Sequence, residues 1–485
     1  MPAYQPTLAS LKQHPVPDWF HDAKFGIMVH WSLSSVPAWA TPSGALHEVV
    51  KEKGFPYWFS HNPYSEWYWN TLKIPGSPTQ QYHAEAFGAD FPYTGFADRF
   101  AKASAQWEAA AWADLFAEVG ARYVVMVTKH HDGYQLWPSR VPHPHRPGFH
   151  APRDFVGELT GAVRQRGLRM GLYYSGGPDW LFEGRAVADA VDMANGIPQT
   201  PEYVRYVDAQ WRELIERYQP SILWNDIGFP ASLDVKALYA DYYNRIPDGV
   251  INDRCLQADV RKLSGNPLGR ALLRFLIGRI LESPAKNGIP KNLHADFTTP
   301  EYASLQQIAA HKWETVRGIG YSFGYNQNET AEHALSVNEL VWMLVDIVSK
   351  NGNLLLNLGP KADGSIPALQ LERVQGLGRW LKVNGEAIFG TRPWVAAESQ
   401  SLAETPVRFT QKGDSLYAIL RGAPAEAKII LPGLRFAAGT GVRLLGESRP
   451  LTLQAETATV ILPGRLPDAP AYALQFTPRP EIVFH

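Results

Sequence analysis

The sequence predicts an α/β protein: a (β/α)8-like barrel followed by a smaller antiparallel β-sandwich. Three observations lead to this prediction. Strand-like and helix-like segments alternate between about residues 20 and 385, polar side chains follow the strands, and the composition changes near residue 390. All 16 tryptophans lie at or before Trp394. The chain of 485 residues is long enough for a large and a small domain. Because the composition changes near residue 390, we assign residues 1–390 to the barrel and 391–485 to the sandwich.

The elements of the barrel are predicted from the spacing of apolar residues. Short apolar runs predict strands at 26–31, 123–128, 169–175, 221–224, 249–252 and 353–358. Helical periodicity is found at 107–119, 154–166, 201–218, 235–245, 337–350 and 368–383. This alternation predicts parallel strands joined by right-handed crossovers, which over this length favours a closed barrel. A doubly wound open sheet is the competing architecture, but no glycine-rich phosphate loop follows an early strand.

The C-terminal region has a different pattern. Short alternating segments separated by Gly and Pro predict antiparallel strands at 407–411, 416–421, 428–431, 442–445, 457–462 and 472–476. Past Trp394 this region has no tryptophan and few clustered polar groups. We expect a packing role, with carbohydrate binding as the alternative.

Charge and cysteine content exclude several classes. The formal net charge is -1, so no large field attracts nucleic acid or an anionic membrane. Cys255 is the only cysteine, which excludes an intrachain disulfide and thiolate zinc sites. The first residues lack the pattern of a signal peptide, and no apolar stretch is long enough to span a bilayer. We expect a cytoplasmic protein, or a periplasmic or secreted one if a signal was removed.

Polar and aromatic residues follow five of the predicted strands. They are His30-Trp31, His130-His131-Asp132-Gly133, Tyr173-Tyr174, Trp224-Asn225-Asp226 and Asn252-Asp253-Arg254. In a barrel the C-terminal ends of the strands carry the chemistry. Asp226 supplies one carboxylate there, and Glu301 supplies another from a loop. A pair of carboxylates at one barrel mouth is typical of glycoside hydrolases.

Eight segments extend this pattern over nearly the whole chain. They are 25–31, 62–67, 128–133, 173–177, 223–226, 252–254, 322–326 and 352–360. Together they resemble the retaining α-L-fucosidases of glycoside hydrolase family 29. The resemblance implies an exo-acting enzyme that hydrolyses terminal α-L-fucosyl linkages through a fucosyl-enzyme intermediate and can transfer fucose to another sugar. It implies no cofactor, no metal, and a fucosylated oligosaccharide or glycoconjugate as substrate.

Matching the motifs residue by residue assigns roles within this chain. The resemblance implies that Asp226 is the nucleophile and Glu301 the general acid/base. It also implies that the sugar is bound by His30, Tyr64, Glu66, Trp67, His130, His131, Tyr173, Trp224, Arg254 and Phe323. The histidines, Glu66 and Arg254 would face the sugar hydroxyls, and Phe323 with Tyr64 would face the methyl group.

Other interpretations of these residues stay open. Asp226 after a strand could be a helix cap or turn residue, and Glu301 after a proline could lie in the first turn of a helix. Glu314 is another carboxylate for the acid/base role. The run from His130 to Asp132 would suit a metal-dependent hydrolase on the same barrel. A non-catalytic fucose-binding protein is a further alternative, although it would need neither Asp226 nor Glu301.

An insertion at about 256–293 separates Arg254 from Glu301. Its middle, residues 268–281, reads LGRALLRFLIGRIL and is more apolar than a solvated surface helix. One interpretation is a helix packed on its own barrel. The other is a subunit interface that makes a homo-oligomer, or a lid over the leaving-group side of the site.

Overall fold

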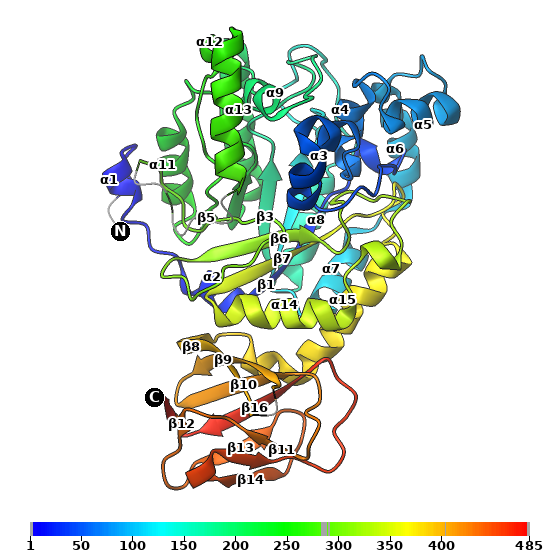
Figure 1. Ribbon diagram of the computed structural model, residues 1–485. Helices are drawn as coiled ribbons and strands as arrows, with labels where there is room; N and C mark the ends of the chain where they lie inside the picture. Colours follow the sequence, from blue (N-terminus) through cyan, green and yellow to red (C-terminus); the bar gives the residue numbers. More distant parts are fainter. Residues whose placement is uncertain (1–2, 283–288, 290–291, 403, 483–485) are drawn as a thin grey trace.

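The computed structural model describes residues 3–282, 289, 292–402 and 404–482. The chain forms a barrel domain and a second, all-β domain, with helices α14 (Val337–Ser349) and α15 (Ala368–Asn384) lying between them (Figure 1). Helix α14 contacts strands β8 (Arg392–Gln400) and β9 (Pro406–Lys412) of the second domain. An ion pair of 2.7 Å between Arg408 on β9 and Asp346 on α14 joins the two domains.

In the described residues the barrel domain is built on a curled sheet of seven parallel strands. Their order is β5-β4-β3-β2-β1-β7-β6. The strands are β1 (Phe25–Val29), β2 (Tyr123–Lys129), β3 (Arg169–Tyr174), β4 (Ile222–Asn225), β5 (Val250–Ile251), β6 (Trp313–Gly318) and β7 (Gly352–Leu358). Nearly every residue in them is buried, as expected of a parallel sheet covered on both faces. The predicted α/β barrel is confirmed.

An irregular segment, 296–302, takes the eighth position. Phe297 bridges Asn252 just after β5, whereas Thr298 and Glu301 bridge Trp313 and Val316 on β6. All three bridges are parallel, so this segment runs in the direction of the strands. Glu301 therefore lies on a strand-like segment and not in the first turn of a helix.

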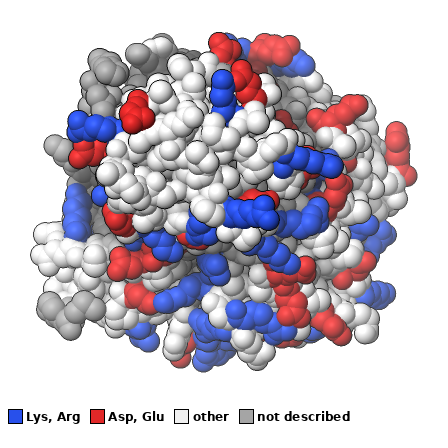
Figure 2. All heavy atoms as spheres, turned by 90° about the horizontal axis from the view of Figure 1, so that it is seen from below, with Lys and Arg blue, Asp and Glu red and all other residues white. Residues whose placement is uncertain are grey.

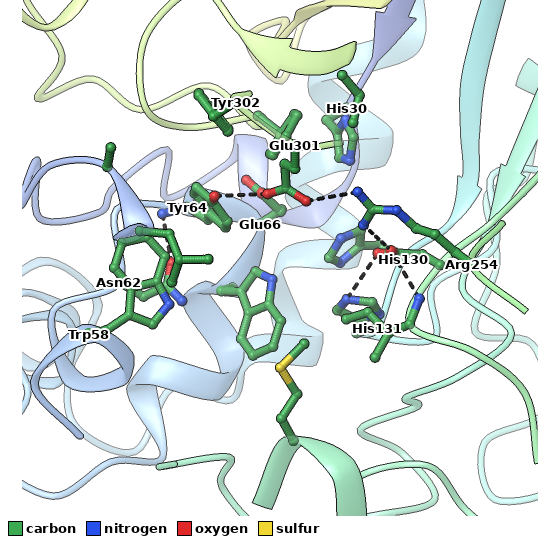
Figure 3. A pocket seen from close by; sticks show the side chains of 18 of the residues that line it. His30, Trp58, Asn62, Tyr64, Glu66, His130, His131, Arg254, Glu301 and Tyr302 are labelled. Atoms are coloured by element: carbon green, nitrogen blue, oxygen red, sulfur yellow. Dashed lines mark hydrogen bonds and ion pairs between the residues drawn. The ribbon is translucent and has the colours of Figure 1, made fainter. Parts of the chain in front are cut away.

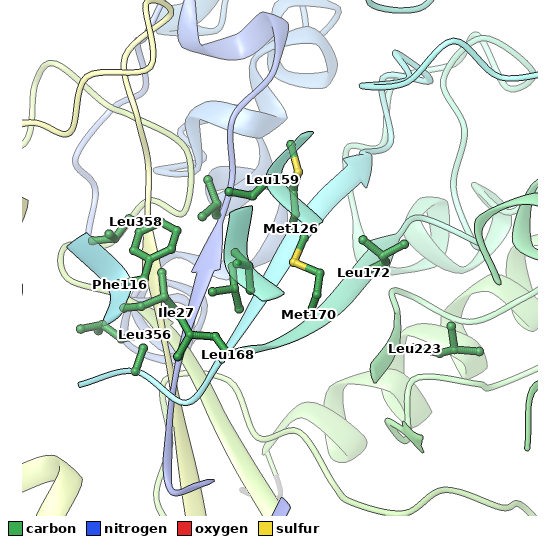
Figure 4. Close-up of a cluster of buried hydrophobic side chains, with 14 of the residues drawn as sticks. Ile27, Phe116, Met126, Leu159, Leu168, Met170, Leu172, Leu223, Leu356 and Leu358 are labelled. Carbon is green, nitrogen blue, oxygen red and sulfur yellow. The ribbon is translucent and has the colours of Figure 1, made fainter. Parts of the chain in front are cut away.

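Helices cover the outside of the sheet, and most follow the predicted bounds. They are α7 (Ala109–Glu118), α8 (Phe155–Gln165), α10 (Pro201–Tyr218), α11 (Val235–Arg245), α14 and α15. Helix α10 begins where predicted because the Thr200 side chain accepts a hydrogen bond from the Tyr203 N–H, with Pro201 first in the helix. The apolar core between sheet and helices includes Ile27, Phe116, Met126, Leu159 and Met170 (Figure 4).

The sequence did not predict the helical segment between β1 and β2. It contains α3 (Leu46–Ser60), the short turn η2 (Ser65–Trp67), α4 (Tyr68–Leu72), α5 (Pro78–Phe87) and α6 (Phe96–Ala103). Helix α3 is kinked, because Gly54 has a φ of 81° and Pro56 follows it. A kink interrupts the 3.6-residue periodicity by which a helix is predicted from sequence.

The described part of the 256–293 region, which leaves out 283–288 and 290–291, forms the helices α12 (Arg261–Ser264) and α13 (Pro267–Glu282). They rise at the end of the barrel opposite the second domain, beside α9 (Ala190–Asn195) (Figure 1). Leu273 is buried, but Leu268 is 84% exposed. Among the described residues, none of the helices combines the length and the apolar character that a membrane-spanning helix requires.

The second domain is an antiparallel β-sandwich. Its main sheet has the order β11-β15-β14-β13-β16-β10-β9-β8, and β12 pairs with β17. The strands after β9 are β10 (Ser415–Arg421), β11 (Lys428–Ile430), β12 (Leu434–Arg435), β13 (Gly441–Leu444), β14 (Pro450–Gln454), β15 (Thr459–Ile461), β16 (Ala471–Thr477) and β17 (Glu481–Ile482). Viewed from this end, positive and negative side chains are interspersed (Figure 2).

Candidate active site

One cavity of about 570 Å³ opens at the C-terminal ends of the barrel strands. All twelve residues that the sequence predicted for the site line it. They are His30, Tyr64, Glu66, Trp67, His130, His131, Tyr173, Trp224, Asp226, Arg254, Glu301 and Phe323. They come from five strand ends, from the segment between β1 and β2, from the segment in the eighth position, and from the loop after β6.

Asp226 directly follows β4 and is held by several donors. Its Oδ2 accepts a 2.8 Å hydrogen bond from Tyr173 Oη, and its Oδ1 accepts one of 2.8 Å from Arg254 Nη1. The backbone N–H of Ile227 donates to Oδ1 as well. His131 Nε2 lies 3.7 Å from Oδ2. These contacts fix the orientation of the carboxylate toward the cavity.

Glu301 faces the same cavity and shares Arg254 with Asp226. Arg254 Nη2 donates to Glu301 Oε2 at 3.0 Å, and Tyr64 Oη donates to Oε1 at 2.9 Å (Figure 3). The guanidinium carbon of Arg254 lies 4.7 Å from the centre of the Trp224 ring. One partly buried cation therefore joins both carboxylates, and its charge compensates theirs.

Three histidines present neutral rings to the cavity. Burial lowers the pKa of His30 to about 4 and puts the pKa values of His130 and His131 well below the ordinary value. His30 Nδ1 lies 2.6 Å from Asn357 Oδ1, and His131 Nδ1 lies 2.6 Å from Ser175 Oγ. A neutral imidazole offers one donor and one acceptor, which suits a hydroxyl group.

Glu66 is a buried carboxyl group without a cation partner among the described residues. Its Oε2 accepts a 2.8 Å hydrogen bond from the Gly324 N–H. Burial raises the pKa of Glu66 to about 8. At neutral pH it is mostly protonated, so it can donate a hydrogen bond as well as accept one.

An apolar corner completes the cavity. The Phe323 ring meets the Tyr64 ring edge-on, with centroids 5.4 Å apart, and lies 5.1 Å from the His30 ring. The Trp67 ring meets His131 edge-on at 5.4 Å. This arrangement of hydroxyl-binding groups on one side and aromatic rings on the other suits a sugar with an apolar substituent.

The family model described as Alpha-L-fucosidase matches residues 1–271 and 278–386. The chain belongs to the α-L-fucosidase family, glycoside hydrolase family 29. It is 32% identical to the tissue alpha-L-fucosidase of Bos taurus, over 98% of this chain and 89% of that one. It is 33% identical to the alpha-L-fucosidase of Dictyostelium discoideum, over 81% of this chain and 75% of that one.

Solved structures support the same assignment. The Thermotoga maritima alpha-fucosidase in complex with a mechanism-based inhibitor has a TM-score of 0.82 and 41% identity to this chain. That alignment covers 98% of this chain and 99% of the other. The Thermotoga maritima alpha-L-fucosynthase, solved with a fucosyl disaccharide azide, has a TM-score of 0.84 over 98% and 100% of the two chains. The protein is thus a glycoside hydrolase with α-L-fucosidase activity.

Glu314 does not line the cavity of this fucosidase. It is fully buried beneath the site, where it accepts hydrogen bonds from Tyr123 Oη and, at 3.2 Å, from Trp224 Nε1. Burial raises its pKa to about 7. Glu314 therefore has no access to a glycosidic oxygen, which excludes it as the acid/base.

One cluster in the described part of the chain has the spacing of a metal site: His130, His131 and Asp226, with ligand atoms within 4.8 Å of one another. The surroundings do not fit a cation. Arg254 already lies 2.8 Å from Asp226 Oδ1, and Tyr173 donates to Oδ2. A metal ion there would face the guanidinium charge at close range, and like charges in a buried site repel strongly.

Sequence reasoning missed two groups of residues at this site. The first lines the cavity and includes Trp58 of α3, Met193 of α9 and Ile227. The aromatic run at 55–59, close to the matched segment at 62–67, was a signal for part of it. The second group orients the side chains that line the cavity: Asn357, Ser175 and Thr299, whose Oγ1 accepts from Arg254 Nε at 3.1 Å.

Proposed function

We propose that this fucosidase is exo-acting and retaining, and works by double displacement with Asp226 as nucleophile and Glu301 as general acid/base. The observation that supports this most is the bridge through Arg254. Retaining glycosidases need two carboxyl groups about 5–5.5 Å apart. A single guanidinium that donates to Asp226 at 2.8 Å and to Glu301 at 3.0 Å favours a separation of this order.

In the first step Asp226 attacks the anomeric carbon while Glu301 protonates the departing oxygen. A fucosyl ester of Asp226 forms, and the leaving group departs as an alcohol. In the second step Glu301 removes a proton from water, which attacks the same carbon and releases fucose. A second sugar in place of water gives transfucosylation.

Recognition of fucose follows from the two sides of the cavity. The neutral rings of His30, His130 and His131 and the protonated Glu66 supply donors and acceptors for the hydroxyls. His130 Nδ1 and His131 Nε2 have no hydrogen-bond partner among the described residues. Phe323 and Tyr64 supply apolar contact for the methyl group. The substrates are fucosylated oligosaccharides or glycoconjugates.

The test is hydrolysis of 4-nitrophenyl α-L-fucoside by wild type and Asp226→Gly. We expect turnover by wild type, a loss of about four orders of magnitude or more in the variant, and rescue by azide. The rescued product should be β-fucosyl azide, as identified by NMR, because azide attacks from the side of the sugar on which the Asp226 carboxylate lies in the wild type.

The matched control is Asp248→Gly, since Asp248 pairs with Arg169 far from the cavity. It should keep wild-type turnover. An Asp226→Gly variant that stays active without azide would contradict the nucleophile assignment. Loss of wild-type activity in EDTA would instead favour the metal-dependent alternative.

A further inference from the structure

We infer that the cavity continues past Glu301 into a leaving-group site, which takes a ring that presents a flat apolar face. This inference rests on the proposed function, because it uses Glu301 as the residue that protonates the leaving oxygen. The inference goes further by naming residues that would bind the leaving group, which is attached to that oxygen.

The size and lining of the cavity leave room for such a site. At about 570 Å³ the cavity is larger than one monosaccharide needs and lies within the roughly 300–1,000 Å³ typical of pockets for drug-sized ligands. Beyond the twelve predicted residues its lining is mainly apolar. The larger apolar side chains are Leu46, Phe55, Trp58, Phe59, Met193 and Ile227, and His47, Glu48 and Asn62 are polar members of the same lining.

One of these side chains, Trp58, is connected to Glu301 through Tyr64. Tyr64 donates to Glu301, and the Trp58 ring meets the Tyr64 ring edge-on at 5.4 Å with an interplanar angle of 88°. Figure 3 shows Trp58 on the far side of Tyr64 from Arg254 and His131. Because an acid must reach the glycosidic oxygen, the leaving group has to lie on the Glu301 side of the sugar.

The side chains of Trp58 and Phe59 are held in place by packing. Trp58 is 4% exposed and Phe59 3% exposed, although both line the cavity. Phe59 packs against Trp67 with ring centroids 5.8 Å apart, and Trp58 belongs to the same apolar cluster as Trp67 and Trp180. Rings fixed in this way lose little conformational freedom when a ligand stacks on them.

The part of the lining at Met193, which packs against this same cluster, depends on α13. Met193 lies on α9, whose N-cap Asp189 pairs with Arg270 and Arg274 of α13, each at 2.8 Å. No described residue of α12 or α13 lines the cavity itself. The described residues of α13 therefore form no direct lid, and they act on the cavity by holding α9.

The chemistry of the walls selects the ligand. Aromatic and aliphatic side chains are the larger part of this lining and bind a flat apolar surface, whereas His47, Glu48 and Asn62 can form hydrogen bonds with hydroxyl groups. Two kinds of leaving group present such a surface: an aromatic ring, and the C–H face of a sugar ring.

The experiment compares three fucosyl donors with wild type, Trp58→Ala and Trp58→Phe. In α-L-fucosyl fluoride the leaving group is too small to reach the walls and needs little help from an acid. 4-Nitrophenyl α-L-fucoside carries an aromatic ring, and a panel of fucosylated disaccharides carries a sugar. Trp69→Ala is the matched control, because Trp69 packs against the same apolar cluster but does not line the cavity.

We expect Trp58→Ala to lower kcat/KM about tenfold on the aryl fucoside, on disaccharides, or on both, with a change of less than about twofold on the fluoride. Trp58→Phe should restore most of the loss. A loss on the aryl fucoside supports the site and shows that it takes an aromatic ring. A loss confined to disaccharides supports a sugar-binding site where KM rises, and it overturns the inference where only kcat falls, because a weakened Glu301 acid would lower kcat.

Equal losses on all three donors would show a structural role for Trp58 and overturn the inference. So would no loss on any donor, or the same selective loss in Trp69→Ala. A wild-type enzyme that turns over none of the donors would instead overturn the proposed function, so the two failures are distinguishable.

Discussion

Carboxyl groups lie both at the mouth of the barrel and in the interior just beneath it, but their partners and their exposure to the cavity differ. At the mouth, Asp226 and Glu301 face the cavity and share the Arg254 cation. Beneath it, Glu314 is fully buried and bonds only to neutral donors, Tyr123 and Trp224, among the contacts described. A carboxyl group beside a cation and open to a cavity is suited to chemistry, whereas a buried one with neutral donors serves to position its neighbours.

Trp224 connects the two regions. Its indole N–H donates to Glu314 below, and its ring lies 4.7 Å from the Arg254 guanidinium above. The interior carboxyl group therefore orients the ring on which the cation of the site rests.

The first test of this comparison is Glu301→Gln. Because Gln cannot give a proton to the leaving oxygen, kcat should fall by about 10²–10⁴ on fucosides with poor leaving groups. The loss on α-L-fucosyl fluoride should be much smaller, since fluoride leaves with little help from an acid. Steady-state kinetics on both donors measure the difference, and equal losses on the two would rule out the acid role.

The second test is Arg254→Met, which removes the cation between the two carboxylates. Breaking a fully buried ion pair from one side costs about 3–5 kcal/mol, and solvent screening of this partly exposed cluster makes the cost smaller, but the melting temperature and the activity should both fall. Arg254→Lys keeps the charge but not the planar fork that reaches both partners, so it should recover stability only in part. Thermal unfolding with unchanged midpoints in both variants would contradict the role of the bridge.

The sequence predicted the barrel well where periodicity is clean. The predicted bounds of α10 and α11 agree with the structure, because each has an amphipathic pattern and a capping residue. Strand β6 was missed because Glu314 and Arg317 interrupt its apolar run. In the structure Glu314 is satisfied by tertiary partners, which no local pattern reveals.

The site was predictable to the extent that its residues follow strands or lie in matched motifs. All twelve predicted residues line one cavity. The walls at Trp58 and Met193 were missed because a kinked helix and a short helix carry them, far apart in sequence. Their proximity depends on packing and on the ion pairs of α13.

The third test is Glu314→Gln. Glu314 accepts hydrogen bonds through both carboxyl oxygens, from Tyr123 and from Trp224. The Gln amide has a single acceptor oxygen, and its NH2 group would face one of these two donors, so one buried hydrogen bond is lost. We expect a loss of about 1–3 kcal/mol in the free energy of unfolding, with kcat changed far less than in Glu301→Gln. Chemical denaturation and kinetics on 4-nitrophenyl fucoside check both. A loss of activity as large as that of Glu301→Gln would mean that Glu314 takes part in the reaction.

The last test concerns Glu66, which lies at the mouth but resembles Glu314, since burial raises its pKa from 4.5 to about 8. The folded state binds this proton more tightly than the unfolded state. Its contribution to stability is therefore complete below pH 4.5 and is lost as the pH rises toward 8. The slope is up to about 1.4 kcal/mol per pH unit for one proton. Glu66→Gln cannot ionise, so its unfolding free energy should fall less steeply over this range.

Glu314 and Glu329, whose pKa values burial raises to about 7, contribute a slope of the same sign, so part of the pH dependence should remain in Glu66→Gln. Glu216→Gln, on the exposed side of α10, should keep the wild-type slope. Urea unfolding between pH 5 and about 8.5 measures all three proteins. An unchanged slope in Glu66→Gln would mean that wild-type Glu66 is ionised, as a carboxylate beside a cation is. Its place at the mouth of the barrel, and not its lack of a cation partner, would then determine its protonation state.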